Sequence, residues 1–235
     1  ITDAWVTMDG QFLGIFELPC KIPILCNHPE SGTHSFDIYP GIKTNGIAAS
    51  RLKYPFYEKF EIDTVLERNT STSLNPTTTY TKQAGFEFYD EGMFEEEKDI
   101  ILINAHSDGP SPIFQNNVVY QGNKSIAINL DDYSDFHIRS TDSLQLKTST
   151  TFLELNFKTD ITLHIGIIII NEPYETKEEL IQLYATDEWK KIYLDLTPLI
   201  IQGNSDSEFQ IYFEGIRDNT TASNSVYLDN LKLVF

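Results

Sequence analysis

Basic side chains are scarce in this 235-residue sequence, which has 17 Lys and Arg against 35 Asp and Glu and a formal charge of −18. Nucleic acids and anionic membranes are bound through basic surfaces that release counterions. The charge balance therefore argues against both kinds of partner. The simplest role for so much acid is solubility and mutual repulsion between molecules.

Long apolar runs are also lacking. The longest, Ile165–Ile170, has the length of a strand, whereas a membrane-spanning helix needs about 20 apolar residues. The sequence therefore predicts no transmembrane segment. Because the chain opens at Ile1 without an initiator Met or a basic and apolar signal, we expect that an upstream export segment has been removed.

Only two cysteines occur, Cys20 and Cys26, which is too few for a disulfide scaffold and does not form a zinc-binding pattern. The sequence pattern between them predicts an extended chain. Six extended residues separate two Cα atoms by about 20 Å, and a disulfide needs roughly 4.4–6.8 Å. Unless the chain reverses near Pro23, we expect two buried thiols that are not bonded to each other.

Recognisable catalytic motifs are missing as well. No glycine-rich phosphate loop occurs, and His28, His34, His137 and His164 lack metal-ligand spacing. The run His106-Ser107-Asp108 holds triad residue types, but three loop neighbours cannot hydrogen-bond in the order nucleophile, base and orienting acid. The sequence therefore predicts a protein that is not an enzyme.

What the sequence does contain is strand patterns. Leu153, Leu155 and Phe157 alternate with polar residues, and apolar residues also recur at every second position in Leu163–Ile169 and Phe209–Phe213. One apolar and one wet face per strand predicts an antiparallel β-sandwich. The segment 69–83 is rich in Thr, Ser and Asn, so we expect a linker there between an N-terminal domain, 1–68, and a larger domain, 84–235.

The last strand pattern, Val226–Phe235, carries Asp229 on its apolar face. We expect this strand to pair with Gly85–Tyr89 and so close the sandwich with its first and last strands. A buried carboxylate needs compensation. Either Asp229 lies at a bulge and accepts backbone N–H groups, or Asp229 and Glu87 help to bind a structural Ca²⁺, which takes roughly six to eight oxygen ligands.

The N-terminal patterns Val6–Gly14 and Gly32–Gly41, with Pro19 and Pro23 between them, resemble PEGA-type surface domains and the related carboxypeptidase-regulatory-like sandwiches. This resemblance implies a small, non-catalytic β-sandwich over residues 1–68. It also implies a bacterial surface protein.

The second domain is similar to galactose-binding-like jelly rolls, a fold that includes many carbohydrate-binding modules. The likeness rests on Phe152–Lys158, Trp189–Thr197, Phe209–Glu214 and Tyr227–Leu233, in that order. Together the two resemblances imply an all-β surface lipoprotein of Gram-negative gut bacteria. Such a protein would be exported to the outer membrane, cell surface or periplasm and attached only through a lipid anchor on the removed N-terminal segment.

Two function classes stay open: a glycan-binding protein, and a scaffold whose sandwiches hold a protein partner. For the first, the wet strand positions predict weak glycan binding, with Tyr212 stacking on a sugar and Glu154, Gln210 and Asn156 as polar contacts. An ordinary solvated sheet face explains these positions equally well. His164 and Glu214 share the same polar faces. Aromatic side chains expected near loops or strand ends are Tyr89, Phe94, Phe114, Tyr133 and Tyr174.

Overall fold

The computed structural model describes the whole chain except residues 26–31, 89, 97–100, 107, 147–149 and 222–223. It divides the chain into two compact units, Ile1–Ala84 and Gly85–Phe235. Both are built almost wholly of antiparallel strands, so the predicted all-β class is confirmed. Within the described residues no helix has the length and apolar character needed to cross a membrane.

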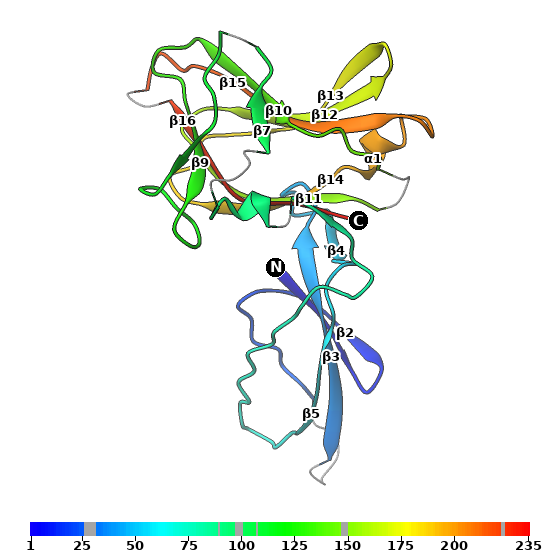
Figure 1. Ribbon diagram of the computed structural model, residues 1–235. Coiled ribbons are helices and arrows are strands. Elements are labelled where there is room, and N and C mark those ends of the chain that lie inside the picture. Colours follow the sequence, from blue (N-terminus) through cyan, green and yellow to red (C-terminus); the bar gives the residue numbers. More distant parts are fainter. Residues whose placement is uncertain (26–31, 89, 97–100, 107, 147–149, 222–223) are drawn as a thin grey trace. The chain divides into compact units, whose positions relative to one another are not determined.

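The first unit holds one sheet of five strands in the order β2-β1-β3-β4, with β5 pairing along β3 (Figure 1). Asp9 and Gly10 both have positive φ, as a two-residue hairpin turn between the first two strands requires. Ala4, Val6 and Phe36 form its small buried cluster. The strands are β1 (Asp3–Met8), β2 (Gln11–Glu17), β3 (Thr33–Lys43), β4 (Arg51–Lys53) and β5 (Phe60–Val65).

The predicted linker makes hydrogen bonds inside the first unit. The Glu58 amide donates to the Thr79 carbonyl at 2.8 Å, and the Thr81 amide donates to Phe56 at the same distance. Cys20 is exposed, which corrects the expectation of a buried thiol, because it lies in an irregular segment outside the sheet. Cys26 lies outside the described residues, so the absence of a disulfide stays a prediction.

The second unit is an antiparallel sandwich of two sheets, stacked face to face in Figure 1. One sheet has the order β13-β12-β15-β10-β7; the other has the order β14-β11-β16-β9-β8, with β6 also pairing with β16. Its elements are β6 (Phe86–Glu87), η1 (Glu91–Met93), β7 (Leu102–Asn104), β8 (Ile113–Gln115), β9 (Ser125–Asn129), β10 (Asp135–Ser140), β11 (Phe152–Thr159), β12 (Leu163–Asn171), β13 (Tyr174–Leu183), β14 (Lys190–Asp195), α1 (Thr197–Ile200), β15 (Glu208–Ile216) and β16 (Ser225–Val234).

The apolar alternation read from the sequence lines the space between these sheets. Leu155 of β11, Ile167 of β12 and Ile211 of β15 are fully buried in one continuous core. The unit is closed by its own ends, as predicted: Gly85 and Phe235 exchange backbone hydrogen bonds of 2.7 and 3.1 Å beside the β6–β16 pair. The strands β11, β12 and β15, whose apolar residues face the core, therefore present their other face away from it.

Candidate functional site

The outer face of the β13-β12-β15-β10-β7 sheet carries a group of polar side chains. On β15, Phe209, Ile211 and Phe213 point into the core, so Tyr212 and Glu214 lie on the opposite face. The register places Tyr212 between Arg139 of β10 and Gly166 of β12. Glu214 lies between His137 and His164 in the next row. We call this surface the β15 face.

Gly166 allows the Tyr212 ring to lie close against the sheet. A Cβ atom at position 166 would lie 2.7 and 2.8 Å from the Cε1 and Cζ atoms of Tyr212 and 2.1 Å from the carbonyl oxygen of Glu178. The ring is therefore only 2% exposed. Burial, with the nearby charge of Glu214, raises the pKa of the Tyr212 hydroxyl, so it stays protonated and can donate a hydrogen bond.

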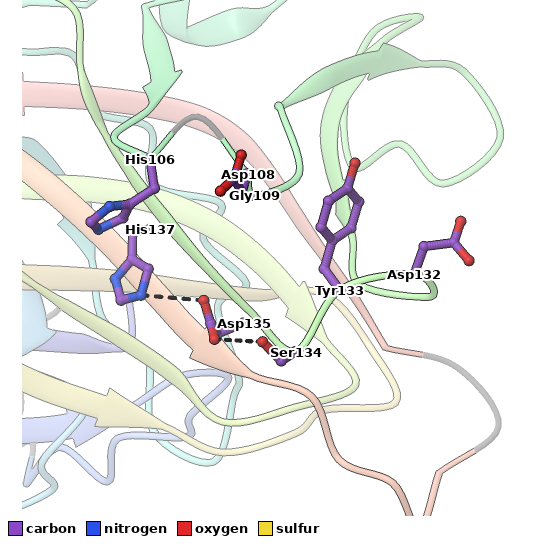
Figure 2. Close-up of a pocket in the computed structure, with 8 residues that line it drawn as sticks. All are labelled: His106, Asp108, Gly109, Asp132, Tyr133, Ser134, Asp135 and His137. Atoms are coloured by element: carbon purple, nitrogen blue, oxygen red, sulfur yellow. Dashed lines mark hydrogen bonds and ion pairs between the residues drawn. The ribbon is translucent and has the colours of Figure 1, made fainter.

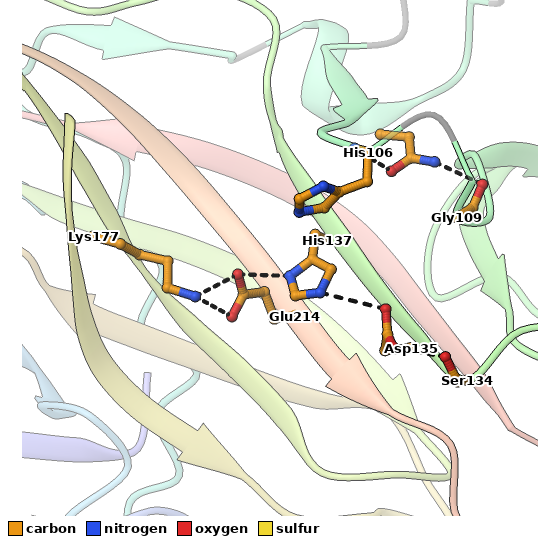
Figure 3. Close-up of polar contacts among 8 residues, drawn as sticks. His106, Gly109, Ser134, Asp135, His137, Lys177 and Glu214 are labelled. Carbon is orange, nitrogen blue, oxygen red and sulfur yellow. Dashed lines mark hydrogen bonds and ion pairs between the residues drawn. The ribbon is translucent and has the colours of Figure 1, made fainter. Parts of the chain in front are cut away.

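Glu214 is held from two sides, as Figure 3 shows. The Lys177 Nζ lies 2.8 Å from each of its carboxylate oxygens, and the His137 Nδ1 lies 2.9 Å from Oε1. To reach Glu214, Lys177 passes 5.3 Å from the centre of the Tyr212 ring. Burial alone would raise the pKa of Glu214, but the hydrogen bonds from Lys177 and His137 outweigh it and lower that pKa.

A second ion pair lies one row away. The Nη1 of Arg139 is 3.4 Å from both carboxylate oxygens of Glu175 at the start of β13. His137 also faces Asp135, with 3.4 Å between Nε2 and Oδ1. These reciprocal contacts fix the side chains of three strands, β10, β13 and β15, in one arrangement.

Two hollows open beside these groups. The first, of about 430 Å³, is lined by Arg139, Glu175, Lys177, Tyr212 and Glu214, together with Ile138, Ile168, Ala105 and the two histidines His106 and His137. The second, of about 300 Å³, lies among the loops that follow β7 and precede β10 (Figure 2). It is lined by His106, Asp108, Gly109, Asp132, Tyr133, Ser134, Asp135 and His137. We call them the sheet hollow and the loop hollow.

The four predicted ligand contacts do not come together. Tyr212 and Gln210 lie on β15, whereas Glu154 and Asn156 lie on β11 of the other sheet, because β11 pairs with β14 and β16 and never with β15. This corrects the expectation that these four residues contact one glycan together. All four are at most 6% exposed. Only Tyr212 lines a hollow, and its covered ring offers no open face for stacking while Lys177 stays in place.

The aromatic side chains predicted near loops or strand ends do not come together at one site either. Phe94 is fully buried, Phe114 packs against it, and Tyr174 is 76% exposed at the start of β13. Tyr89 lies outside the described residues. Tyr133 is 39% exposed and lines the loop hollow, which makes it the predicted aromatic with the best position for a ligand.

Asp229 lies at a bulge of β16 and is fully buried. Its Oδ2 accepts the backbone N–H groups of Tyr120 and Gln121 at 3.0 and 3.1 Å, and its Oδ1 accepts the N–H of Asn230 at 2.7 Å. Asn230 takes the positive φ that the bulge requires. Of the two alternatives for Asp229, the bulge therefore describes the backbone of β16 at this position.

Glu87 is exposed and pairs opposite Leu233, four residues along β16 from Asp229. The structure does not bring the two predicted calcium ligands together. Among the described residues, no group of three or more His, Cys, Asp or Glu side chains is arranged to hold a metal ion. A structural Ca²⁺ stays a hypothesis.

No sequence pattern assigns His106, His137, Arg139, Glu175 or Lys177 to a site. Their rings and charges meet only through pairing of β7, β10, β13 and β15, which are distant in the sequence. His106 and Asp108 have the residue types of a catalytic triad. They instead line the loop hollow, and Ser107 lies outside the described residues. The sequence feature that points to this site is the polar face of the Phe209–Glu214 strand pattern, which carries both Tyr212 and Glu214.

No family model matches the sequence, and no curated protein matches it. Solved structures do match in part. A family 22 carbohydrate-binding module of Clostridium thermocellum Xyn10B is 10% identical over 61% of this chain and 90% of its own, with a TM-score of 0.43. A family 30 module from a cellulosomal cellulase of the same organism is 13% identical over 57% of this chain and 91% of its own, with a TM-score of 0.42.

An enzyme domain is also among the similar structures. The enzymatically active domain of tailspike protein 4 from bacteriophage CBA120 is 11% identical over 61% of this chain and 20% of its own, with a TM-score of 0.46. Carbohydrate-binding modules with jelly-roll folds thus occur repeatedly among the solved structures that this chain resembles.

Proposed function

We propose that this protein binds carbohydrate, without chemically changing it, at the sheet hollow of the β15 face. The observation that carries the proposal is the set of polar side chains around this hollow that hold one another in place. Lys177, His137 and Glu214 form one linked group, and Arg139 with Glu175 forms another. Sugar hydroxyls both donate and accept hydrogen bonds, and prearranged donors and acceptors reduce the entropy lost on binding.

The apolar part of the hollow fits the same ligand class. Ile168 and the Tyr212 ring line it beside the charged groups. Ligand sites combine apolar walls with a few oriented polar groups. Of the four residues predicted from the sequence, a ligand in this hollow would contact Tyr212.

A glycan array screened with the whole chain, followed by calorimetry on the polysaccharides that bind, tests the proposal. Glu214→Gln should weaken binding roughly tenfold because it removes the charge that anchors Lys177 and His137. Glu179→Gln is the matched control. Glu179 lies on the same face and pairs with His164 at 2.8 Å, but neither residue lines the hollow. No binding on the array, or equal losses in both variants, would remove this site.

We also propose that the protein is exported and held at the outer membrane, the cell surface or the periplasm by a lipid anchor. The resemblance of residues 1–68 to bacterial surface domains supports this location. Cell fractionation with protease treatment of intact cells tests it, since a surface protein should be cleaved and a periplasmic one protected.

A second candidate function is the scaffold. Phe12, Ile15 and Leu18 are 57%, 40% and 44% exposed on and just after the edge strand β2. An exposed apolar edge can add a strand from a partner protein. Phe12→Lys should then abolish capture of an envelope partner and leave glycan binding unchanged.

A further inference from the structure

The two hollows are neighbours that share one wall. His106 and His137 line both, and their rings meet edge to face with centroids 4.6 Å apart and an interplanar angle of 75°. A ligand extending from the sheet hollow over this ring pair enters the loop hollow. At about 430 and 300 Å³, each hollow is at the lower end of the roughly 300–1,000 Å³ of small-ligand sites, so each can hold one small unit of a longer ligand.

The cations in the sheet hollow already have carboxylate partners within it. Lys177 contacts both oxygens of Glu214, and Arg139 contacts both oxygens of Glu175. Two positive and two negative side chains therefore balance. A carboxylate or sulfate on a ligand would have to displace a protein carboxylate before it gained a cation.

Apart from the two histidines, the charged side chains that line the loop hollow are all acidic. Asp108, Asp132 and Asp135 line it, and its described lining includes neither Lys nor Arg. Arg217 lies near the same turn, with its guanidinium donating to the Asp131 carbonyl, but it does not line the hollow. Carboxylates accept hydrogen bonds from sugar hydroxyls and repel other anions. The exposed ring of Tyr133 adds a surface on which an uncharged sugar can stack.

From this continuity and charge distribution we infer that the protein binds along a neutral glycan chain of two or more sugars, one unit in each hollow, and rejects the polyanionic form of the same chain. This inference rests on the proposed carbohydrate binding and adds the class of glycan. Tyr133 and Asp132 act as specificity-determining residues in the loop hollow, and Arg139 and Glu214 act in the sheet hollow.

The test compares a neutral polysaccharide with its own oxidised form. Xylan, β-1,4-galactan and a mannan are tested first; galactan and mannan are then oxidised at their primary hydroxyls, which become carboxylates on an unchanged backbone. Affinity electrophoresis with the whole chain should show binding to a neutral polysaccharide and at least roughly tenfold weaker binding to its oxidised form. The difference should shrink at high salt, because salt screens exposed charges.

Variants then test whether the loop hollow causes the preference for the neutral polysaccharide over its oxidised form. Asp132→Asn with Asp135→Asn should reduce the ratio between neutral and oxidised affinities severalfold. Asp187→Asn with Asp206→Asn removes the same number of exposed carboxylates outside both hollows and should leave the ratio unchanged. Tyr133→Ala should weaken binding of a tetrasaccharide more than binding of a monosaccharide.

The outcomes distinguish a failure of the inferred neutral specificity from a failure of the proposed carbohydrate binding. Equal or tighter binding of the oxidised polysaccharide would overturn the inferred neutral specificity and leave carbohydrate binding intact. An unchanged ratio in the Asp132 and Asp135 variant would overturn the role of the loop hollow. If neither form of any polysaccharide binds, the proposed function and the inference both fail.

Discussion

At the residue scale, Gly166 decides how Tyr212 and Lys177 are arranged. With no side chain at this position, the ring lies against β12 and Lys177 can cross it to Glu214. The same side chain that completes the ion pair also covers the aromatic ring. The close packing of the Tyr212 ring against β12 thus depends on one small residue.

Gly166→Ala should therefore destabilise the second unit by about 1–3 kcal/mol, the usual cost of overpacking. The added Cβ would lie 2.1 Å from the backbone oxygen of Glu178, which cannot rotate away as a side chain can. Urea unfolding measures the change. Gly109→Ala is the control, since the atoms nearest to its new Cβ would be those of the Asn104 side chain at 3.1–3.5 Å. An equal loss in both variants would contradict the explanation.

Glu214 gives a prediction for pH. Its pKa is lowered in the folded state, so its contribution to stability is complete above the ordinary value of 4.5 and is lost as the pH falls through the lowered folded value. The difference in unfolding free energy between the natural protein and Glu214→Gln should shrink as the pH is taken below 4.5. Chemical unfolding at a series of pH values measures it; a difference that stays constant would contradict the lowered pKa.

Asp229 is the other decisive carboxylate, and here burial raises the pKa although three backbone N–H groups act against that shift. Asp229→Ala would leave the Tyr120 and Gln121 amides without their acceptor and should cost about 2–4 kcal/mol. Thermal unfolding tests this. A chelator should not change the melting temperature of either protein, and a chelator-sensitive melt that Asp229→Ala abolishes would support calcium instead.

At the scale of elements, the loop 116–124 is held by carboxylates from two other segments. Asp229 accepts the amides of Tyr120 and Gln121, and Glu95 accepts the amides of Asn123 and Lys124. Gly122 between them has a positive φ, and Glu95 occupies the space that a Cβ there would need. The buried Asp229 and the partly buried Glu95 thus accept backbone hydrogen bonds that a neighbouring strand would otherwise accept from the loop.

Glu95→Gln should consequently speed up hydrogen exchange at the amides of Asn123 and Lys124, because a neutral amide group accepts their hydrogen bonds less strongly than a carboxylate does. Exchange in β11 should stay unchanged, which serves as the internal control. Faster exchange throughout the unit would show general destabilisation and contradict a local role for Glu95.

At the scale of the whole molecule, the second unit has one continuous core and pairs its own first and last strands. A fragment 85–235 should therefore fold cooperatively by itself, with a single unfolding transition and native near-ultraviolet circular dichroism. Limited proteolysis of the full chain should yield a stable fragment that begins near this boundary. Loss of cooperative unfolding in the isolated fragment would contradict its independence.

The sequence determined the features that repeat at short range. Alternating apolar residues in Leu153–Phe157, Leu163–Ile169 and Phe209–Phe213 were sufficient to predict strands, their inward faces and the all-β fold, because period-two patterning is a local property of the chain. The terminal strand and its partner near Gly85 were also predictable. A chain end with a strand pattern needs a partner, and the other candidate strand began the same domain.

The tertiary structure alone decided which polar faces meet. β11 and β15 have the same pattern, yet long-range pairing places them in different sheets and separates Glu154 and Asn156 from Tyr212. β13, whose charged sequence Tyr174–Leu183 shows little alternation, pairs with the preceding strand β12. The long-range pairing of β12 with β15 then brings Lys177 and Glu175 of β13 to the sheet hollow. Strand partners are chosen by contacts between residues far apart in the sequence, and a local pattern does not contain that information.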